Sequence, residues 1–507
     1  MRGGRQICSR NPIHQHRLRT MTPLPGNVQG HEIGSKQFGM QDQQIFASLS
    51  CDRNPMHVDP VAARRLLTGQ PVVHGIHVLM TALEYWENGS AQPPAFLDCT
   101  FNNPVSVGDI VVFRQIRYEN GDTVIEAGVN GLLCARLRLT AARAPSPQTA
   151  TVAGAEVEGT GGRPVLERVG TPLDESPDHH LNRKYSIRLD PVDVSRSFPR
   201  TCDRLGASRA AGLLALSYFV GMVCPGLHSI FSRVTLKLDA PAAATPVVDF
   251  SVDRYDERFR LFNVSLSGML SGSLAAFLRP VPQQQLTMAD VSMRVTRDEF
   301  KGTRSLVVGA SRGLGELAAK ILAAGGGDVT ITYAQGLEDI EVVNAEINAS
   351  GLGSSRIQKL DATAWDFDAI DFAALNAIYL FATPRINRKK AAVFVPSLLH
   401  EFIDFYVKSL YDLCRHIESL ALPGKIRVYV PSSVFVTERP EGLTEYAMAK
   451  AAAEILADDL NRAFSKVSIV VTRLPRLSTD QTTSVLKTSS DDNLDALLPA
   501  IRTMTRR

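Results

Sequence analysis

The segment RSLVVGASRGLGELAAKILAAGGGDVTITYA, at residues 304–334, constrains the fold more than any other stretch of the chain. An apolar strand runs into a glycine-rich turn, an amphipathic helical pattern follows, and a second apolar strand closes the unit. Such a unit forms a right-handed crossover in a parallel sheet. Later apolar strands, AIYLFAT and KIRVYVPSS, alternate with helical stretches such as residues 442–464. The C-terminal part therefore predicts an α/β, Rossmann-type doubly wound parallel sheet.

The glycine turn within this segment has the context of a dinucleotide-binding loop, because it follows a strand and opens a helix. Gly309 allows the tight turn, and Gly313 and Gly315 let the backbone approach a pyrophosphate at the helix N-terminus. The predicted cofactor-binding residues of the turn are Gly309, Ser311, Arg312, Gly313, Leu314 and Gly315.

Tyr446 and Lys450 lie four residues apart in a helical stretch, so they share one face. An ammonium beside a phenol favours the phenolate, and we therefore expect the pKa of Tyr446 to lie below its ordinary value of about 10. Tyr446 could then deliver a proton to a carbonyl oxygen, which Ser433 could also hydrogen-bond. The alternative is an ordinary exposed pair on a helix.

Residues 298–507 resemble the short-chain dehydrogenase/reductase family through the glycine turn, Ser433, Tyr446 and Lys450. The resemblance implies that these three side chains are catalytic and that Tyr446 and Lys450 also contact the cofactor. It implies an adenine contact for Asp361, for which a surface aspartate is the alternative. Arg312 in the turn, and a second strand that ends without an acid, favour NADP over NAD.

Three positions depart from that family's pattern. Val308 stands where the family has Thr, Ala382-Thr383-Pro384 replaces Asn-Ala-Gly, and Lys408 occupies the place of a helical Asn. Slow reduction, or nucleotide binding without turnover, therefore remains open beside full activity.

The stretch CDRNPMHVDP, at residues 51–60, gathers ionisable side chains around a proline. Pro55 disfavours helix at Asn54, so we expect Asp52 and His57 to converge on a turn. A carboxylate and an imidazole placed together suit proton transfer. An Asx-turn with a surface histidine is the alternative.

The longer string at residues 48–80 resembles the MaoC-like (R)-specific enoyl-thioester hydratase and dehydratase family, a branch of the hotdog fold, through D-x-N-P-x-H-x-D and V-V-H-G. The resemblance implies that catalytic Asp52 and His57 hold the water that adds to or leaves C3 of an acyl chain, and handle the proton at C2. It implies substrate-binding roles for Asn54, His74 and Gly75, with a backbone N–H at His74-Gly75 directed at the thioester oxygen. We interpret His77 as a packing residue.

Two blocks of the chain read as copies of each other. Cys51-Asp52-Arg53 and Gly75-Ile76-His77 recur as Cys202-Asp203-Arg204 and Gly226-Leu227-His228 at an offset of 151 residues. Gly131 also matches Gly268, at a shorter offset. We therefore predict an internal duplication.

Each copy has an apolar helical stretch, at 61–85 and 207–223, before alternating strands, which is an α+β pattern. Ser208 stands where the offset places the catalytic histidine, so Asp203 is interpreted as structural. By resemblance to double-hotdog members, the second copy should shape an acyl pocket without chemistry.

These patterns predict a multidomain chain, an α+β double hotdog followed by the α/β sheet. The expected divisions are a basic tail (1–30), the catalytic hotdog copy (31–142), a linker (143–180), the degenerate copy (181–280), a second linker (281–297) and the reductase-like domain (298–507). The first twenty residues carry five arginines and no acid. A working start near Met21 is favoured, with a disordered tail or an organelle presequence as alternatives.

Composition excludes several classes of function. The net charge of +3 is spread along the chain, so a nucleic-acid partner is not expected. No apolar run reaches the roughly 18 residues of a membrane span, and residues 210–226 read as a buried helix. Seven scattered cysteines without a CxxC pair predict neither a disulfide framework nor a metal site, and fit a reducing, cytoplasmic setting.

The two resemblances act on consecutive steps. The sequence therefore predicts an NADPH-dependent 3-oxoacyl-thioester reductase fused to a 3-hydroxyacyl dehydratase, with substrates on CoA or acyl carrier protein. One alternative keeps only the hydratase active, with a degenerate nucleotide module; another gives the reductase a different carbonyl substrate. A homo-oligomer through the reductase domain is compatible with the resemblance.

Overall fold

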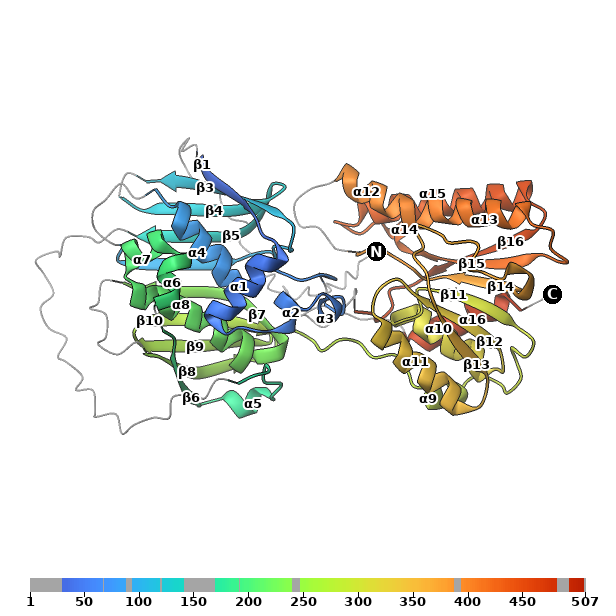
Figure 1. Ribbon diagram of the computed structural model, residues 1–507, viewed down its shortest axis with the longest axis horizontal. Helices are drawn as coiled ribbons and strands as arrows, with labels where there is room; N and C mark the ends of the chain where they lie inside the picture. Colours follow the sequence, from blue (N-terminus) through green and yellow to red (C-terminus); the bar gives the residue numbers. More distant parts are fainter. Residues whose placement is uncertain are drawn as a thin grey trace, which may run out of the picture.

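The computed structural model describes residues 30–66, 68–87, 94–118, 121–140, 169–190, 192–238, 247–386, 394–480 and 492–505. They form two lobes that lie side by side, one from the N-terminal half of the chain and one from the C-terminal half (Figure 1). Most of the expected tail (1–30) and of the expected linker (143–180) lies outside the described residues.

The first lobe is built on a ten-stranded sheet in the order β1-β3-β4-β5-β2-β7-β10-β9-β8-β6, and its neighbouring strands pair antiparallel. The pairing of β2 with β7 joins two groups of five strands. The strands are β1 (His31–Gln37), β2 (Phe96–Phe101), β3 (Ile110–Arg117), β4 (Thr123–Val129), β5 (Leu132–Thr140), β6 (Lys184–Arg188), β7 (Ser229–Lys237), β8 (Val247–Asp256), β9 (Leu261–Gly268) and β10 (Ser271–Leu278).

Helices cover one face of this sheet (Figure 1). The two most apolar, α4 (Gly75–Tyr85) and α8 (Ala207–Tyr218), contact each other within one core that both groups of strands share. The others are α1 (Met40–Ser50), α2 (Pro55–Val58), α3 (Pro60–Ala63), α5 (Pro177–His180), α6 (Val192–Ser197), α7 (Pro199–Leu205), the π-helical turn η1 (Phe219–Val223) and the 3-10 turn η2 (Gly226–His228).

The helix expected over 61–85 is interrupted. Only α3 and α4 are helical there. Gly69, which has a left-handed φ of 63°, and Pro71 interrupt the helix between them. The stretch expected over 207–223 is continuous but changes to a π-helical turn at Phe219.

The two groups of strands follow the same order, with β1, β3, β4, β5 and β2 matched by β6, β8, β9, β10 and β7. The matched hairpins turn at Gly131 and Gly268, whose φ angles are 81° and 85°. Both glycines therefore meet the same backbone requirement at equivalent places. This symmetry supports the duplication at the shorter of the two offsets.

The offset of 151 residues is wrong. Gly75 opens the central helix α4, whereas Gly226 lies in η2, after the other central helix has ended. Cys51 ends α1, whereas Cys202 lies inside α7. Ser208 consequently stands near the start of α8 and is not the structural counterpart of His57. Three-residue matches carry too little information to fix an alignment between two halves with different inserted helices.

The second lobe contains a parallel six-stranded sheet in the order β13-β12-β11-β14-β15-β16. This arrangement confirms the doubly wound parallel sheet predicted from the glycine-turn segment. The strands are β11 (Arg304–Val308), β12 (Asp328–Tyr333), β13 (Ser354–Lys359), β14 (Ala377–Leu380), β15 (Ile426–Ser433) and β16 (Val467–Leu474).

Successive side chains of these strands point to opposite faces of the sheet, and they pack into two hydrophobic cores, one on each face. Val307 packs with α10 (Gly313–Ala324), α11 (Leu337–Ser350) and α16 (Asn493–Thr503). Leu306 and Val308 pack on the other face with α13 (Ser409–Ser419) and α15 (Thr444–Ala463). The remaining helical segments are α12 (Pro396–Ile403), the π-helical turn η4 (Asp404–Lys408), α14 (Phe435–Glu438) and the 3-10 turn η3 (Phe372–Ala374).

The expected linker at 281–297 is only partly a linker. Residues Met288–Ser292 form helix α9, and Met288 and Val291 are buried in the core that contains α10. The spacing of Met288, Val291 and Val295 is helical, but the segment is too short to give a clear periodic signal. The packed second lobe therefore begins before residue 298.

Among the described residues, no single helix has the length and apolar character to cross a membrane. The pair Pro199–Leu205 and Ala207–Val223 passes that test only when joined across a bend of 112°.

Candidate active sites

The loop that carries Asp52 is held between two helices. Helix α1 ends at Ser50, and Cys51 turns the chain with a left-handed φ of 59°. Asn54 then caps α2 by accepting a hydrogen bond from the Met56 N–H at 3.1 Å. Pro55 occupies the first position of α2, where the missing N–H is not needed. His57 thus points from one short helical turn rather than from an open loop.

Asp52, His57 and His74 meet in a buried cluster, with one potential ligand atom of each within 4.8 Å of the others. The rings of His57 and His74 stack with centroids 3.8 Å apart. His74 also has Nδ1 at 3.0 Å from Gln43 Oε1 and Nε2 at 3.1 Å from the Asp52 carbonyl. The side chain of His74 therefore braces the loop, a role that the motif alone did not indicate.

His57 has a defined tautomer. Its Nδ1 lies 2.7 Å from the carbonyl oxygen of Val72, which can only accept, so Nδ1 carries the proton. Nε2 is then left with a free lone pair whenever the ring is neutral. Burial lowers the pKa of His57 to about 4, although the Val72 carbonyl opposes this shift, so the ring is neutral at pH 7.

The carboxyl of Asp52 titrates near neutrality. Burial raises its pKa to about 7, while hydrogen bonds from the Ser217 hydroxyl and the Asn54 N–H pull the value down. Asp52 and His57 together present a carboxyl that gains or loses a proton near pH 7 and an imidazole lone pair. This combination suits general acid–base chemistry at neutral pH.

The second half of the first lobe fixes the loop that carries Asp52 in place. Ser217, on α8, donates to Asp52 Oδ2 at 2.7 Å. Asn54 Nδ2 donates to the carbonyls of Gly221 and Gly226 at 2.8 and 3.1 Å. A Cβ on Gly221 would lie 2.2 Å from Asp52 Oδ1, so only glycine fits there. The copy expected to lack chemistry therefore positions the residues of the other copy.

Gly75 begins helix α4, so its N–H is one of the donors that have no partner within the helix. A Cβ at Gly75 would approach the ring of Phe101 to 3.1 Å. The position fits the expected backbone donor near His74-Gly75. His77, one turn further, stacks on Phe46 at 4.6 Å and meets Phe38 edge-on, which is the geometry of a packing residue.

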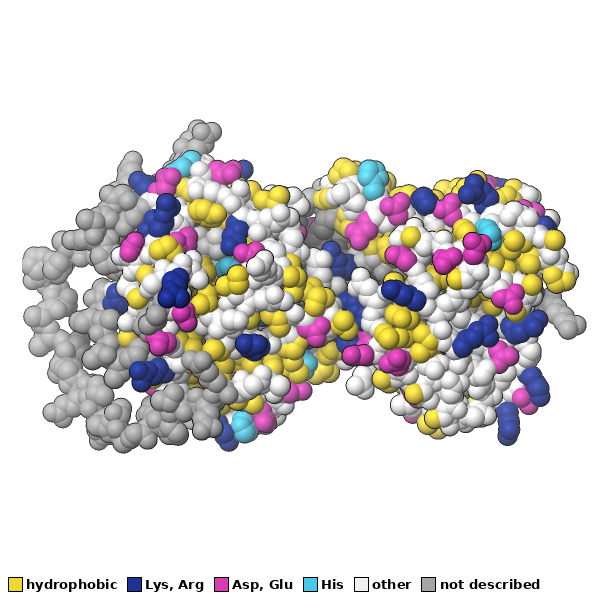
Figure 2. Space-filling model, viewed as in Figure 1, with side chains coloured by type: hydrophobic (Ala, Val, Ile, Leu, Met, Phe, Trp, Pro, Cys, Tyr) yellow, Lys and Arg dark blue, Asp and Glu magenta, His cyan; other side chains and the backbone are white. Residues whose placement is uncertain are grey.

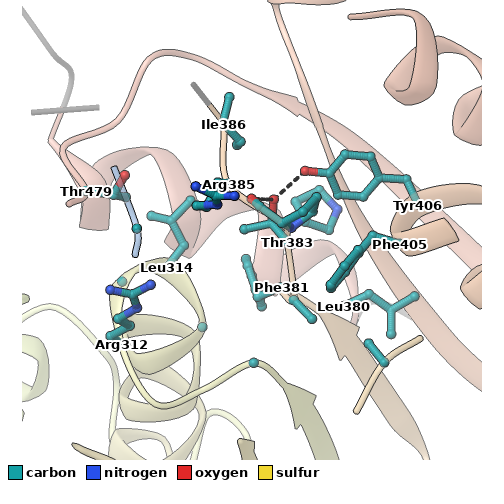
Figure 3. Close-up of a pocket in the computed structure, with 18 of the residues that line it drawn as sticks. Arg312, Leu314, Leu380, Phe381, Thr383, Arg385, Ile386, Phe405, Tyr406 and Thr479 are labelled. Carbon is teal, nitrogen blue, oxygen red and sulfur yellow. Dashed lines mark hydrogen bonds between the residues drawn. The ribbon is translucent and has the colours of Figure 1, made fainter. Parts of the chain in front are cut away.

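In the second lobe, a cavity of about 530 Å³ opens at the carboxyl ends of the parallel strands. It brings together every candidate that the sequence singled out in this lobe. These are Gly309, Ser311, Arg312, Gly313, Leu314, Gly315, Asp361, Ser433, Tyr446 and Lys450. Figure 3 shows two of them, Arg312 and Leu314, beside other residues that line the cavity.

The glycine turn has the shape of a backbone cradle. Gly309 has a φ of 82°, and a Cβ there would lie 2.7 Å from the Ala382 N atom. A Cβ on Gly315 would lie 2.1 Å from the Gly309 carbonyl, so the helix and the turn could not approach so closely with any other residue. Helix α10 begins at Gly313 and directs its free N–H groups to this turn. The cradle fits a pyrophosphate.

Tyr446 does not have the lowered pKa expected from the sequence. Burial raises the pKa of Tyr446 to about 12, although a hydrogen bond with Ser433 opposes the shift. Burial also lowers the pKa of Lys450 to about 7. The Lys450 ammonium donates to the Pro431 carbonyl at 2.7 Å and lies 5.8 Å from the centre of the Tyr446 ring. Desolvation therefore outweighs the attraction between the two side chains.

Lys408 does not replace the helical Asn at the pocket. Its side chain is exposed and pairs with Asp412 at 2.6 Å. Tyr406, from the same π-helical turn, enters the pocket instead and hydrogen-bonds Thr383 (Figure 3). The Lys450 ammonium lies 3.6 Å above the Tyr406 ring, a cation–π contact that the sequence did not reveal.

Asp361 follows β13 and lines the pocket, so both of its interpretations have support. Its Oδ1 accepts from the N–H and hydroxyl of Thr363 at 2.8 and 2.7 Å. The carboxylate thus closes a local Asx-turn while facing the cavity.

Two residues of the first lobe, Arg64 and Gly69, also line this cavity. Neither residue was predicted to belong to this site, because both lie more than 200 positions away from the glycine turn.

Known proteins match parts of the chain. A family model described as a MaoC like domain matches residues 11–127. The (R)-specific enoyl-CoA hydratase of Aeromonas caviae is 36% identical over 95 residues, which cover 17% of this chain and 69% of that protein.

Solved structures similar to part of this chain include two with bound NADP. A short chain dehydrogenase from Burkholderia cenocepacia is 22% identical with a TM-score of 0.35, and the match covers 41% of this chain and 91% of that one. A 3-oxoacyl (acyl-carrier-protein) reductase from Agrobacterium tumefaciens is 22% identical with a TM-score of 0.32, covering 36% and 74%.

Proposed function

We propose that this chain, which belongs to the MaoC-like family, catalyses two consecutive steps on acyl thioesters. The first lobe, a double hotdog in this proposal, removes water from a 3-hydroxyacyl thioester or adds water to the 2-enoyl thioester. The second lobe reduces the 3-oxoacyl thioester to the 3-hydroxyacyl form. The carrier is CoA or acyl carrier protein.

The meeting of Asp52 and His57 in one buried cluster carries the proposal. Dehydration removes a proton from C2 and a hydroxyl from C3. One member of the pair takes the C2 proton, and the other protonates the departing hydroxyl, which leaves as water. Addition of water reverses these transfers. The backbone N–H at Gly75 stabilises the charge that develops on the thioester oxygen.

The second lobe fits a nicotinamide dinucleotide, because its glycine cradle has no room for side chains at Gly309 and Gly315 and Arg312 stands at the helix N-terminus. Bound NADPH would supply the hydride. The residues that would hold it are those of the glycine turn, with Asp361 at the adenine end and Lys450 near the reacting end. Tyr446, whose high pKa keeps its proton on the phenol oxygen, donates that proton to the substrate carbonyl oxygen with Ser433 as a second donor.

One assay tests both activities. The protein is incubated with NADPH and acetoacetyl-CoA, and NADPH absorbance and crotonyl-CoA formation are followed together. Tyr446→Phe should abolish NADPH consumption while water addition to crotonyl-CoA continues. Asp52→Asn should leave reduction intact and slow water transfer by roughly 10²–10⁴-fold. Parent-like behaviour of both variants would refute the residue assignments.

A second candidate keeps only the water-transfer step. It is favoured by the Tyr446–Lys450 geometry, because the ammonium faces Pro431 and Tyr406 rather than the phenol oxygen. Parent protein that binds NADPH and hydrates crotonyl-CoA but never oxidises NADPH with 3-oxoacyl thioesters would support it. Oxidation of NADPH with another ketone alone would instead indicate a different carbonyl substrate.

A further inference from the structure

The first lobe reaches the second through the short segment after α3, and Figure 2 shows basic side chains gathered in the hollow between the lobes. Arg64 Nη1 donates to the Gln335 carbonyl at 2.6 Å, and Arg64 Nη2 donates to Asp339 Oδ2 at 2.7 Å. Arg312 donates in turn to the Arg64 carbonyl. The segment after α3 is thus tied to the glycine turn and to the start of α11.

Arg64 occupies a particular place in the second lobe. Gln335 lies in the connection that follows strand β12 and leads into α11. In doubly wound sheets that bind dinucleotides, the end of this second strand faces the adenosine ribose, and the residue there reads the ribose 2′ position. The Arg64 guanidinium therefore stands beside the position that a 2′-phosphate would take. Gly336 leaves room for it, since a Cβ there would lie 1.7 Å from Arg64 Nη2.

Arg64 retains capacity to bind an anion. A guanidinium has five N–H donors, and the bonds to Gln335 and Asp339 use two of them. Its Nε is buried and has no hydrogen-bond partner among the described residues. The side chain lines the same cavity as the glycine turn.

Arginine side chains outnumber the carboxylates that pair with them at this end of the cavity. Three guanidinium groups, on Arg64, Arg65 and Arg312, face two carboxylates, on Asp339 and Asp480. The neighbouring Glu316 is paired with Lys320 at 2.8 Å, and Lys320 also pairs with Glu346 at 2.7 Å. A dianionic phosphate is the ligand that suits such a site, because arginine binds phosphate through paired N–H donors.

We propose that Arg64, carried by the MaoC-like lobe, acts with Arg312 as the receptor for the ribose 2′-phosphate of NADPH. The dinucleotide site is then built by both lobes, and the preference for the phosphorylated cofactor depends on a residue outside the Rossmann-type sheet. This inference rests on the proposed function of the second lobe.

The test measures the binding of NADPH, NADH and adenosine 2′,5′-bisphosphate to the full chain by calorimetry. Arg64→Gln should weaken NADPH and the bisphosphate by roughly tenfold or more, the usual size of a lost charge-assisted hydrogen bond, and leave NADH unchanged. Arg65→Gln is the matched control, because Arg65 pairs with the same Asp339 at 2.6 Å but does not line the cavity. The NADPH affinity of Arg65→Gln should change by less than about threefold, because solvent screens a charge that lies outside the cavity.

The variant Asp339→Asn distinguishes two roles of Arg64: recognition of the 2′-phosphate, and attachment of one lobe to the other. It removes a negative charge beside the phosphate position, so NADPH should bind more tightly while NADH binding stays the same. If Arg64 only attaches the lobes, Arg64→Gln and Asp339→Asn would both weaken NADPH and NADH alike, and the inference is wrong. Parent-like NADPH binding by Arg64→Gln also refutes it. A parent protein that binds neither dinucleotide refutes the proposed reductase function itself.

Discussion

The Ser217 hydroxyl donates a hydrogen bond of 2.7 Å to the Asp52 carboxylate, across 165 positions of the chain. Ser217 belongs to the central helix of one half of the first lobe, and Asp52 to the loop after α1 in the other half. The bond opposes the rise in the pKa of Asp52 that burial causes. The protonation of Asp52, one of the two proposed acid–base groups, therefore depends on a side chain from the other half of the lobe.

We expect Ser217→Ala to move the pH dependence of water transfer. Loss of this hydrogen bond removes a stabilising contact of the charged carboxylate, so the pKa of Asp52 rises above its value of about 7. The midpoint of the rate of crotonyl-CoA hydration against pH should move up by roughly one pH unit. Ser48→Ala is the control, because that hydroxyl bonds only within its own exposed helix turn. An unchanged midpoint in Ser217→Ala would contradict the coupling.

Gly221→Ala should impair the same site by steric means. A methyl group would lie 2.2 Å from Asp52 Oδ1, inside any tolerable contact, so the carboxylate must leave its position. We expect hydration of crotonyl-CoA to fall roughly 10²-fold or more. Gly170→Ala provides the comparison, since its new methyl group would meet nothing within 4 Å. Circular dichroism should show both variants folded; a folded and fully active Gly221→Ala would refute the arrangement.

Tyr406 should matter to reduction through its ring rather than its hydroxyl. The ring lies 3.6 Å below the Lys450 ammonium and stabilises the charged form in a buried place. Tyr406→Leu should lower the pKa of Lys450 below about 7, so that NADPH-dependent reduction declines at lower pH than in the parent. Tyr406→Phe keeps the ring and should retain the parent profile. The pH profiles of reduction in the two variants decide the matter, and equal behaviour would exclude the cation–π role.

Local patterns predicted the second lobe well. The strand, glycine turn and helix at residues 304–334 follow from contacts close in sequence, and the turn residues do meet in one cavity. The correspondence between one hairpin in each half of the first lobe was also visible in the sequence through Gly131 and Gly268. Glycine stands at both positions because both require a left-handed φ.

Long-range contacts were not predictable from these patterns. Arg64 meets Gln335 across 271 positions, and nothing in the sequence near either residue marks the contact. The prediction of a lowered pKa for Tyr446 was wrong for a different reason. The spacing of Tyr446 and Lys450 shows that they are neighbours, but it does not show that both are buried. Burial reverses the sign of the expected shift, since desolvation penalises the phenolate and the ammonium alike.

The final prediction concerns stability. The pKa of Asp52 is raised from 3.8 to about 7 in the folded protein, so folding favours the protonated carboxyl. The associated stability is complete below pH 3.8 and is lost as the pH rises through about 7. Asp52→Asn, which stays neutral, should therefore be more stable than the parent at pH 8 by a few kcal/mol, an order-of-magnitude figure from the linkage relation.

The variant is compared with the parent at each pH, because His57 acts in the opposite direction and its contribution, which both proteins share, cancels in the difference. Its pKa falls from 6.5 to about 4 on folding, so its effect on stability arises as the pH falls through that range and is constant above it. Urea unfolding of parent and Asp52→Asn at pH 6 and pH 8, followed by a signal from the first lobe, isolates the carboxyl. The stability advantage of the variant should grow between these two values. An advantage that shrinks as the pH rises would mean that the Asp52 carboxylate is stabilised in the folded protein. Asp52 would then be ionised well below neutral pH, which contradicts its proposed titration near pH 7.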